Sequence, residues 1–262
     1  MKKSVKILLF FLAAIFTGVF VFSGYKLYSI MHEYKVAEQK YNGLSNQYVA
    51  AAPSTTPFAV NGTETQAPQP KNEIPITVDF DTLRQQSSGV VGWIYSPGTV
   101  INYPIVQAAD NDYYLHRFID GSYNSGGSIF MDYQVASDFS GPNTIIYGHH
   151  MNDGSMFASL SNYKTAGYYE EHPYMYILTP TQNYRLELFS GYVTNGDADV
   201  YMMIQPEASA FQSYLNRAYS YSNFSSNVSA TAQDHIVILS TCSYEYDDAR
   251  YIVLGKLVPI DG

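Results

Sequence analysis

The chain contains 262 residues and carries a formal net charge of −9. This acidic balance argues against nucleic acid as a partner, because phosphate binding requires clustered Lys and Arg. The single Cys excludes an internal disulfide and any metal site built from several cysteines. The 26 Tyr and 14 Phe residues suit half-buried strands and wet binding grooves.

The N-terminus carries the pattern of a membrane anchor. Three lysines within residues 1–6 precede an apolar run that extends to residue 27, which gives the about 20 residues needed to span a bilayer. Only a poor match to a small-x-small cleavage site follows, and this favours an uncleaved anchor over a signal peptide. Because basic flanks stay in the cytoplasm, we expect a single-pass segment over 7–27 in the cell membrane, with the N-terminus inside and the rest of the chain on the extracellular face.

Two connecting segments are expected between the anchor and the folded domain. Residues 28–49 are mostly polar and helix-compatible, and they predict a juxtamembrane helical stalk. Residues 50–73 are rich in Pro, Thr, Ala and Gln without an apolar period, which predicts a flexible linker. Residues 74–262 then form one domain that is long enough to bury a hydrophobic core.

Helical patterns in the domain are few. Helical segments are expected over 79–86, 110–118, 156–163 and 206–219. The first can be capped by Asp79 or Asp81. The last is the clearest, because Phe211, Leu215 and Ala218 share one helical face and a Pro stands in its first turn.

Short apolar runs separated by turn residues dominate the domain and predict strands. The expected strands are 90–95, 100–107, 127–132, 143–147, 174–179, 184–194, 236–239 and 251–254. Pro104 places its strand at an edge or a bulge, because proline has no N–H to donate to a neighbouring strand. About eight short strands with few helices indicate a mainly β fold, either a barrel or a sandwich.

Two β-branched runs near the C-terminus flank a short polar loop. Cys242 ends the first run and Arg250 begins the second, so neighbouring strands bring a thiol and a guanidinium to one rim of a sheet. A lone Cys is most often a small buried hydrophobe. Cys242, however, follows Ser240 and Thr241 at the polar end of its strand, and an unpaired thiol in an exported chain is a liability unless it is used. It is therefore a candidate nucleophile.

Histidines at another strand end are candidates for activating this thiol. A thiol with its ordinary pKa of about 8.5 needs a base or a cation nearby to react at neutral pH. His149 and His150 directly follow Gly148 at the end of an apolar run, and a metal site is a weak alternative because no carboxylate or Cys set accompanies them. Cys242 attacking a carbonyl, one of these histidines protonating the leaving amine, and Arg250 holding the oxyanion would form a plausible site.

These residues resemble the signature of the sortases, the cysteine transpeptidases of Gram-positive surfaces. Residues 239–242, followed by Arg250, resemble the Thr-Leu-x-Thr-Cys…Arg motif, and residues 147–151 resemble the catalytic-histidine segment. In that segment the histidine directly after the glycine is the family's, so the resemblance favours His149 and leaves His150 as a neighbour. The resemblance covers essentially residues 74–262, and class B is the most similar through segments 91–94, 103–107, 110–115, 127–132 and 154–157.

The resemblance implies an eight-stranded sortase-type β-barrel with an N-terminal helix and a helix before the last two strands. The enzyme would cut a C-terminal sorting signal after Thr, in an Asn-Pro-Gln-Thr-Asn-like or Pro-x-Thr motif, through a thioester on Cys242. His149 would act as general acid/base and Arg250 as stabiliser of the oxyanion or substrate, with no cofactor and no metal. The implied partners are surface proteins with a sorting signal and a peptidoglycan precursor or crossbridge amine. The implied groove residues are Asn111, Leu115, Tyr147, Ser240 and Thr241.

Three positions depart from the class B pattern. Ile238 stands where Thr is usual, and Ser243 and Tyr244 follow the cysteine where some class B members carry acidic residues. A fixed acidic group that orients His149 is therefore not expected, and the acidic residues of the following loop are expected mainly to face water. A pilin-polymerising sortase, a hydrolytic cysteine peptidase and a non-enzymatic extracellular domain that binds peptide or glycan remain as alternatives.

Overall fold

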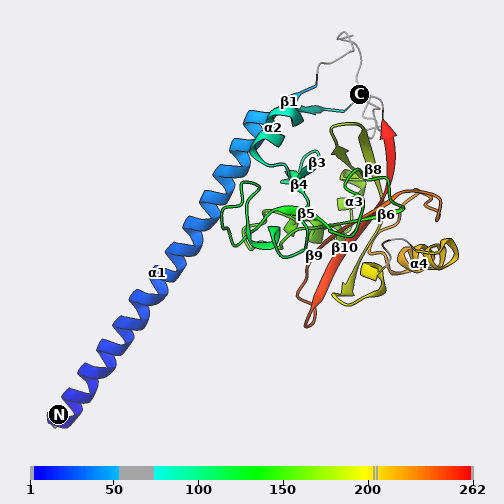
Figure 1. The fold of residues 1–262 in the computed structure, drawn as a ribbon. Coiled ribbons are helices and arrows are strands. Elements are labelled where there is room, and N and C mark those ends of the chain that lie inside the picture. The colour runs from blue at the N-terminus through cyan, green and yellow to red at the C-terminus, as the bar shows by residue number, and fades with distance from the viewer. Residues whose placement is uncertain (1–2, 53–73, 203, 205, 261–262) are drawn as a thin grey trace, which may run out of the picture. The chain divides into compact units, whose positions relative to one another are not determined.

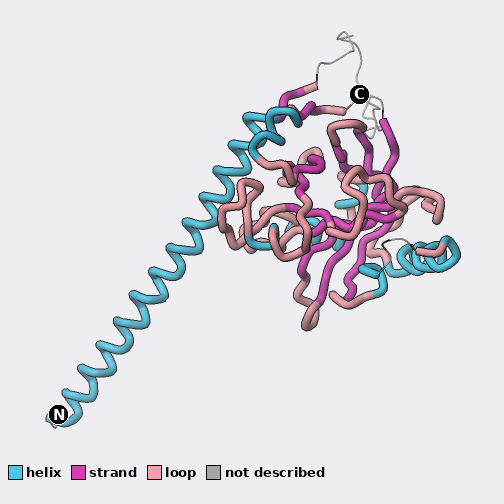
Figure 2. Tube along the Cα trace, in the orientation of Figure 1, coloured by secondary structure: helices cyan, strands magenta, loops and turns pink. Residues whose placement is uncertain are grey.

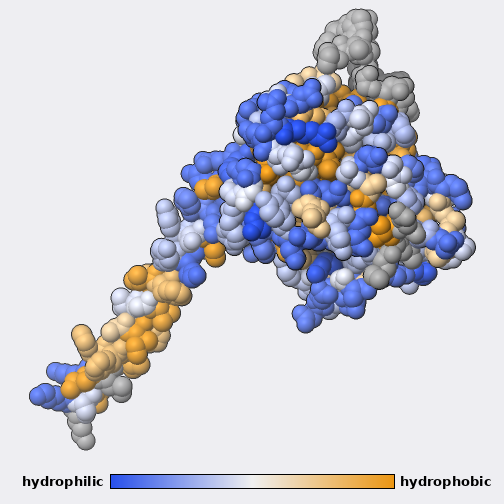
Figure 3. Space-filling view, in the orientation of Figure 1, coloured by the Kyte–Doolittle hydropathy of each residue, from blue (hydrophilic) through white to orange (hydrophobic). Residues whose placement is uncertain are grey.

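The computed structural model describes residues 3–52, 74–202, 204 and 206–260, and the chain divides into two units. In its described part the first unit, Met1–Lys40, consists of most of helix α1 (Lys3–Tyr48). Large apolar side chains are exposed along this part of the helix (Figure 3), which by length and composition can cross a membrane. The second unit, Tyr41–Gly262, holds all the other elements.

The second unit is built around a closed barrel of eight strands (Figure 1). The strands follow the order β10-β8-β7-β3-β4-β5-β6-β9 around the barrel. The pairs β4–β5 and β6–β9 are parallel, and the other neighbours are antiparallel. Their bounds are β3 Val90–Tyr95, β4 Asn102–Val106, β5 Ile129–Met131, β6 Asn143–Tyr147, β7 Tyr174–Leu178, β8 Asn183–Asn195, β9 Ile236–Cys242 and β10 Ala249–Ile260. The predicted mainly β, eight-stranded barrel is thus confirmed.

Strand β9 lies between the barrel interior and a covering helix. The helix is α4 (Ala208–Tyr221), which precedes the last two strands and lies beside the barrel (Figure 2). Its buried face, with Phe211 and Leu215, packs in one cluster with Ile236 and Ile238 of β9. Because side chains alternate along a strand, Ser240 and Cys242 lie on this same outer face, further along β9. The C-terminal end of β9 therefore presents Ser240 and Cys242 on its outer face.

Shorter elements differ in detail from the sequence-based expectations. The helix α2 (Phe80–Gln86) begins after Asp79, whose carboxylate accepts the Thr82 N–H at 3.0 Å. The segments expected at 110–118 and 156–163 are 3₁₀ turns, η1 (Tyr114–His116) and η2 (Ala158–Lys164). The remaining short helices are α3 (Tyr168–Glu171) and η3 (Asp199–Met202).

Pro104 does not mark an edge strand, since β4 pairs with β3 on one side and β5 on the other. The ladder with β5 includes only Ile105 and Val106, so the proline stands before it. The pairing of β3 with β4 also contains a register shift between Val90 and Gly92, beside the regular pair of Trp93 with Pro104. The barrel thus accommodates proline without opening.

The second unit begins at Tyr41, whereas the sequence placed its start near Ile74. Tyr41 and Tyr48 of helix α1 are buried, and the Tyr41 hydroxyl donates to the Gly127 carbonyl at 2.6 Å. The strand β1 (Val49–Ala51) pairs with β2 (Ile76–Val78), although residue 49 was expected to end the helical stalk and residues 50–51 to begin the linker. Tyr34, Tyr41 and Tyr48 are spaced seven residues apart, which indicates one helical face but not the surface that buries it. Tyr41 and Tyr48 are buried against the domain. The expected linker beyond residue 52 lies outside the described residues.

Candidate active site

Three neighbouring strands bring the candidate residues to one end of the barrel. Cys242 pairs with Arg250 in the antiparallel ladder of β9 and β10, and Ser240 pairs with Tyr147 in the parallel ladder of β9 and β6. The Gly148 N–H then donates to the Ser240 carbonyl at 3.1 Å, and His149 follows. The register alone therefore places a thiol, a guanidinium and an imidazole on adjacent strand ends.

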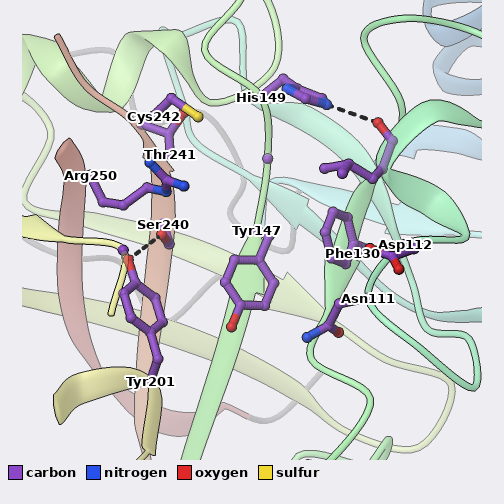
Figure 4. Close-up of a pocket in the computed structure, with 13 residues that line it drawn as sticks. Asn111, Asp112, Phe130, Tyr147, His149, Tyr201, Ser240, Thr241, Cys242 and Arg250 are labelled. Atoms are coloured by element: carbon purple, nitrogen blue, oxygen red, sulfur yellow. Dashed lines mark hydrogen bonds between the residues drawn. The ribbon is translucent and has the colours of Figure 1, made fainter. Parts of the chain in front are cut away.

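These strand ends border a pocket of about 330 Å³ (Figure 4). In Figure 4 the Cys242 sulfur points from β9 toward the side of the pocket that carries His149. All three candidate catalytic residues and all five expected groove residues line this pocket. The lining residues are Asn111, Asp112, Leu115, Phe130, Tyr147, Gly148, His149, Gly196, Tyr201, Ser240, Thr241, Cys242 and Arg250.

The His149 imidazole is oriented by a backbone carbonyl. Its Nε2 lies 2.8 Å from the Leu115 carbonyl oxygen, which can only accept, so Nε2 carries a proton. Burial lowers the pKa of His149 below 6.5, the Leu115 carbonyl opposes this, and nearby His116 lowers the pKa further. The His116 ring stacks on His149 with ring centroids 5.5 Å apart. The other ring nitrogen, Nδ1, is therefore the atom that can exchange a proton with a reacting group.

The glycine before His149 is required by close packing. A Cβ on Gly148 would lie 2.5 Å from the Ile129 side chain and 2.7 Å from the Phe157 ring. The Phe157 N–H also donates to the His149 carbonyl at 3.0 Å. Residues 148–149, which follow β6, therefore pack closely against Phe157. This packing and the hydrogen bond fix the backbone of His149.

Arg250 is held by an acidic residue from the loop between β9 and β10. Its Nη2 lies 2.8 Å from Asp248 Oδ1, and its Nη1 donates to the Ala249 carbonyl at 3.1 Å. Gly196, which lines the pocket, lies against Asp248, and a Cβ there would come within 2.5 Å of the Asp248 carboxylate. Asp248 was expected mainly to face water with the other acidic residues of its loop, and the role of Gly196 was not predicted. Their arrangement limits where the guanidinium points.

The opposite wall of the pocket depends on a buried carboxylate, Asp132. Its Oδ2 accepts from the Asn111 Nδ2 and from the Tyr147 hydroxyl, both at 2.9 Å. Asn111 Oδ1 in turn accepts the Tyr133 N–H at 3.1 Å. Burial first, and then the Asp132 charge, raises the pKa of Tyr147 far above 10. Asn111 and Tyr147, both expected groove residues, are therefore held by the same carboxylate. Asp132 was not predicted to have this role from the sequence.

Tyr201 is a further pocket residue that the sequence did not indicate. Its hydroxyl lies 2.8 Å from the Ser240 Oγ, and its ring stacks on Tyr147 with centroids 6.1 Å apart. Burial raises the pKa of Tyr201 to about 12, so the hydroxyl stays protonated at neutral pH. Tyr201 belongs to η3, a short turn without apolar periodicity, and only the abundance of tyrosine hinted at such a wall.

Two remaining expectations are modified by the contacts around β9. Alternation turns the Thr241 side chain away from the face that carries Cys242, and its buried Oγ1 has no hydrogen-bond partner within the described part of the chain. The loop after Cys242 does more than face water, because Glu245 forms an ion pair with Lys164 of η2. Hydrogen bonds from Lys164 and Ser243 lower the pKa of Glu245 to about 2.

Comparison with known proteins agrees with this fold and pocket. The Sortase domain family model matches residues 94–258. Sortase B of Listeria monocytogenes is 35% identical over 249 residues, which cover 94% of this chain and 95% of the relative. Sortase B of Staphylococcus aureus is 32% identical over 193 residues, 72% of this chain and 79% of the relative.

Solved structures give the same result. The crystal structure of sortase B from B. anthracis matches with a TM-score of 0.71 at 33% identity, covering 87% of this chain and 99% of that one. A substrate complex of S. aureus sortase B matches with a TM-score of 0.65 at 32% identity, covering 70% and 85%. A barrel of this topology with one cysteine at its pocket defines a cysteine transpeptidase. The chain belongs to the sortase family, in class B.

Proposed function

We propose that this class B sortase cleaves a C-terminal sorting signal after Thr and transfers the surface protein to a cell-wall amine. The signal would be Asn-Pro-Gln-Thr-Asn-like or a Pro-x-Thr variant, and the amine a peptidoglycan precursor or crossbridge. The observation that carries the proposal is the single pocket that Cys242, His149 and Arg250 line together. That a related S. aureus sortase B has been solved in complex with a substrate supports substrate binding by this chain.

In the first step the Cys242 thiolate attacks the Thr carbonyl carbon and a C–S bond forms. Arg250, which Asp248 holds by an ion pair, would stabilise the oxyanion, the kind of preorganised contribution that accelerates acyl transfer. The C–N bond then breaks as His149 gives the departing amine the proton that its Nδ1 took from the Cys242 thiol when the thiolate formed. Leu115 supports the charged ring, because its carbonyl accepts from Nε2 whether or not Nδ1 is protonated.

In the second step the incoming amine attacks the thioester. The new C–N bond forms, the C–S bond breaks, and the sulfur returns to the thiolate. The proton lost by the amine passes to His149, which restores the enzyme. The wall formed by Asn111, Tyr147 and Ser240 would hold the signal peptide during both steps.

The N-terminal segment suits this role. We propose that residues 7–27 anchor the protein as a single-pass segment, with residues 1–6 in the cytoplasm and the catalytic domain outside. The described part of α1 supports this through its length and exposed apolar side chains. Protease added to intact cells is expected to remove the catalytic domain and spare the anchor.

The activity is tested with full-length protein in detergent, a sorting peptide and an oligoglycine acceptor. Mass spectrometry is expected to show cleavage after Thr and a product joined to the amine, with neither in Cys242→Ala. Cleavage without a joined product would identify a hydrolytic peptidase instead. Absence of cleavage over a panel of Pro-x-Thr and Asn-Pro-Gln-Thr-Asn peptides would contradict the proposal.

A further inference from the structure

His150 faces a different partner from its neighbour His149. Its Nδ1 lies 3.0 Å from the main-chain carbonyl oxygen of Cys242. Because a carbonyl oxygen only accepts, Nδ1 of His150 must be the donor. The Ser161 Oγ lies 3.4 Å from the same nitrogen. The two consecutive histidines therefore divide their contacts, one lining the pocket and the other touching the backbone of the nucleophile.

The end of the β6–β9 ladder explains why this carbonyl needs a side-chain donor. The parallel pairing runs up to Tyr147 and Ser240, and the Gly148 N–H still donates to the Ser240 carbonyl. Carbonyls two residues apart point to the same edge of a strand, so the Cys242 carbonyl is the next acceptor on this edge. The chain after Gly148 leaves the ladder, and the His150 imidazole takes the place of the missing backbone N–H.

His150 is itself fixed at both its backbone and its ring. It forms an isolated β-bridge with Met156, next to the Phe157 contact that holds His149. The Tyr244 ring meets its ring edge-on, with centroids 5.2 Å apart. Residues 149–150 thus supply both the imidazole that lines the pocket and the side chain that hydrogen-bonds the Cys242 backbone. The His150–Cys242 hydrogen bond therefore limits movement of Cys242 relative to His149, in addition to the pairing of Cys242 with Arg250 in the ladder.

We infer that His150 is a positioning residue: its Nδ1–H holds the main chain of Cys242 so that the thiol stays opposite His149. The kinetic consequence rests on the proposed function, whereas the structural consequence does not. Loss of the bond leaves a carbonyl without its partner at the strand end and loosens residues 242–244. The signal-binding wall on the other side of the pocket, at Asn111 and Tyr147, is unaffected.

Two substitutions separate the hydrogen bond from the ring packing. His150→Asn keeps an N–H at the position of Nδ1 and removes the ring, while His150→Phe keeps a ring and removes the donor. For full-length protein in detergent, we expect His150→Phe to lower kcat for a sorting peptide about fivefold to tenfold, the effect of one hydrogen bond, with KM unchanged. His150→Asn is expected to stay within about twofold of wild type, because it retains the donor.

Hydrogen exchange supplies a readout that does not need activity. Backbone amides of 242–244 are expected to exchange faster in His150→Phe, and at the wild-type rate in His150→Asn. If wild type turns over no peptide, the proposed function fails while exchange still decides the role of His150. The inference would be overturned if His150→Phe showed the same amide exchange and the same kcat as wild type. It would also be overturned if both variants lowered kcat and accelerated exchange equally.

Discussion

Arg250 stands directly opposite Cys242 in the antiparallel ladder of β9 and β10. Directly paired residues of an antiparallel ladder project to the same face of the sheet, so the guanidinium and the thiol share one side of the barrel wall. Asp248, one residue before β10, holds Arg250 through a 2.8 Å contact. The charge that the proposed reaction needs is therefore built into the register of two strands.

Replacing Arg250 tests whether this charge supports catalysis. Arg250→Ala is expected to lower kcat/KM for a sorting peptide by about 100-fold or more, the loss typical of removing an oxyanion stabiliser. Arg250→Lys is expected to recover only part of it, because an ammonium lacks the planar fork of donors. Peptide cleavage rates followed by chromatography measure both. Wild-type rates in Arg250→Ala would remove the residue from the mechanism.

Tyr201 is expected to act in binding rather than in chemistry. Tyr201→Phe removes the 2.8 Å contact with Ser240, and we predict that it raises KM about threefold to tenfold with little change in kcat. The effect should be the same from pH 6 to 9, since the Tyr201 pKa of about 12 keeps the hydroxyl protonated. Tyr192→Phe is the matched control, because Tyr192 bonds Tyr214 and does not line the pocket. Equal KM effects in both variants would contradict a specific role.

The pKa of His149 is expected to lie below 6.5 and to respond to His116. Burial favours the neutral ring and the electrostatic effect of nearby His116 lowers the His149 pKa further, so His116→Asn should raise the pKa of His149. NMR titration of the imidazoles measures this, with His172→Asn as the control, because His172 contacts the Pro97 carbonyl and does not line the pocket. Because the folded-state pKa is lowered, the unfolded chain binds the proton more readily. The stability that neutral His149 contributes is therefore present above pH 6.5 and lost as pH falls through its folded pKa.

A pH series of denaturant unfolding checks the same sign. Wild type is expected to lose free energy of unfolding as pH falls below 6.5, and His149→Asn to lose less. An unchanged difference between the two proteins across that range would show that burial does not depress the His149 pKa.

Asp132 is expected to stabilise the domain and its pocket together. Asp132→Ala leaves the Asn111 amide and the Tyr147 hydroxyl without their acceptor, and we predict a loss of about 1–3 kcal/mol in the free energy of unfolding. KM for the peptide should rise as well, because both groups line the pocket. Asp138→Ala is the control, since Asp138 is an exposed carboxylate that accepts from the backbone of Ser140. Equal stability of the two variants would argue against Asp132 as the residue that holds Asn111 and Tyr147 in place.

Much of the site could be read from strand ends. Two β-branched runs fix strands that end at Cys242 and begin at Arg250, and an apolar run before Gly148 places His149 similarly. Strand period then puts these residues at the sheet rim without any knowledge of the barrel. The resemblance to sortases added the groove residues, all of which line the pocket.

Other contacts depend on pairings between distant segments that no local pattern encodes. Asp132 and Tyr201 lie in or beside short elements without periodicity, and each meets its partners only after the barrel closes. The spacing around Tyr41 indicates a helical face. The residues that contact Tyr41, such as Gly127, lie far along the chain and cannot be identified from that spacing. The hydrogen bond between the His150 ring and the Cys242 carbonyl joins residues 92 positions apart.

The most direct test of the account is to trap the acyl-enzyme. Full-length protein is mixed with a sorting peptide without an acceptor amine, quenched in acid and digested for tandem mass spectrometry. We predict that the peptide fragment ending in Thr is attached to Cys242 in wild type, and that His149→Ala and Arg250→Ala each reduce the yield strongly. A fragment attached to another residue, or wild-type yields in both variants, would contradict a site formed by these three side chains.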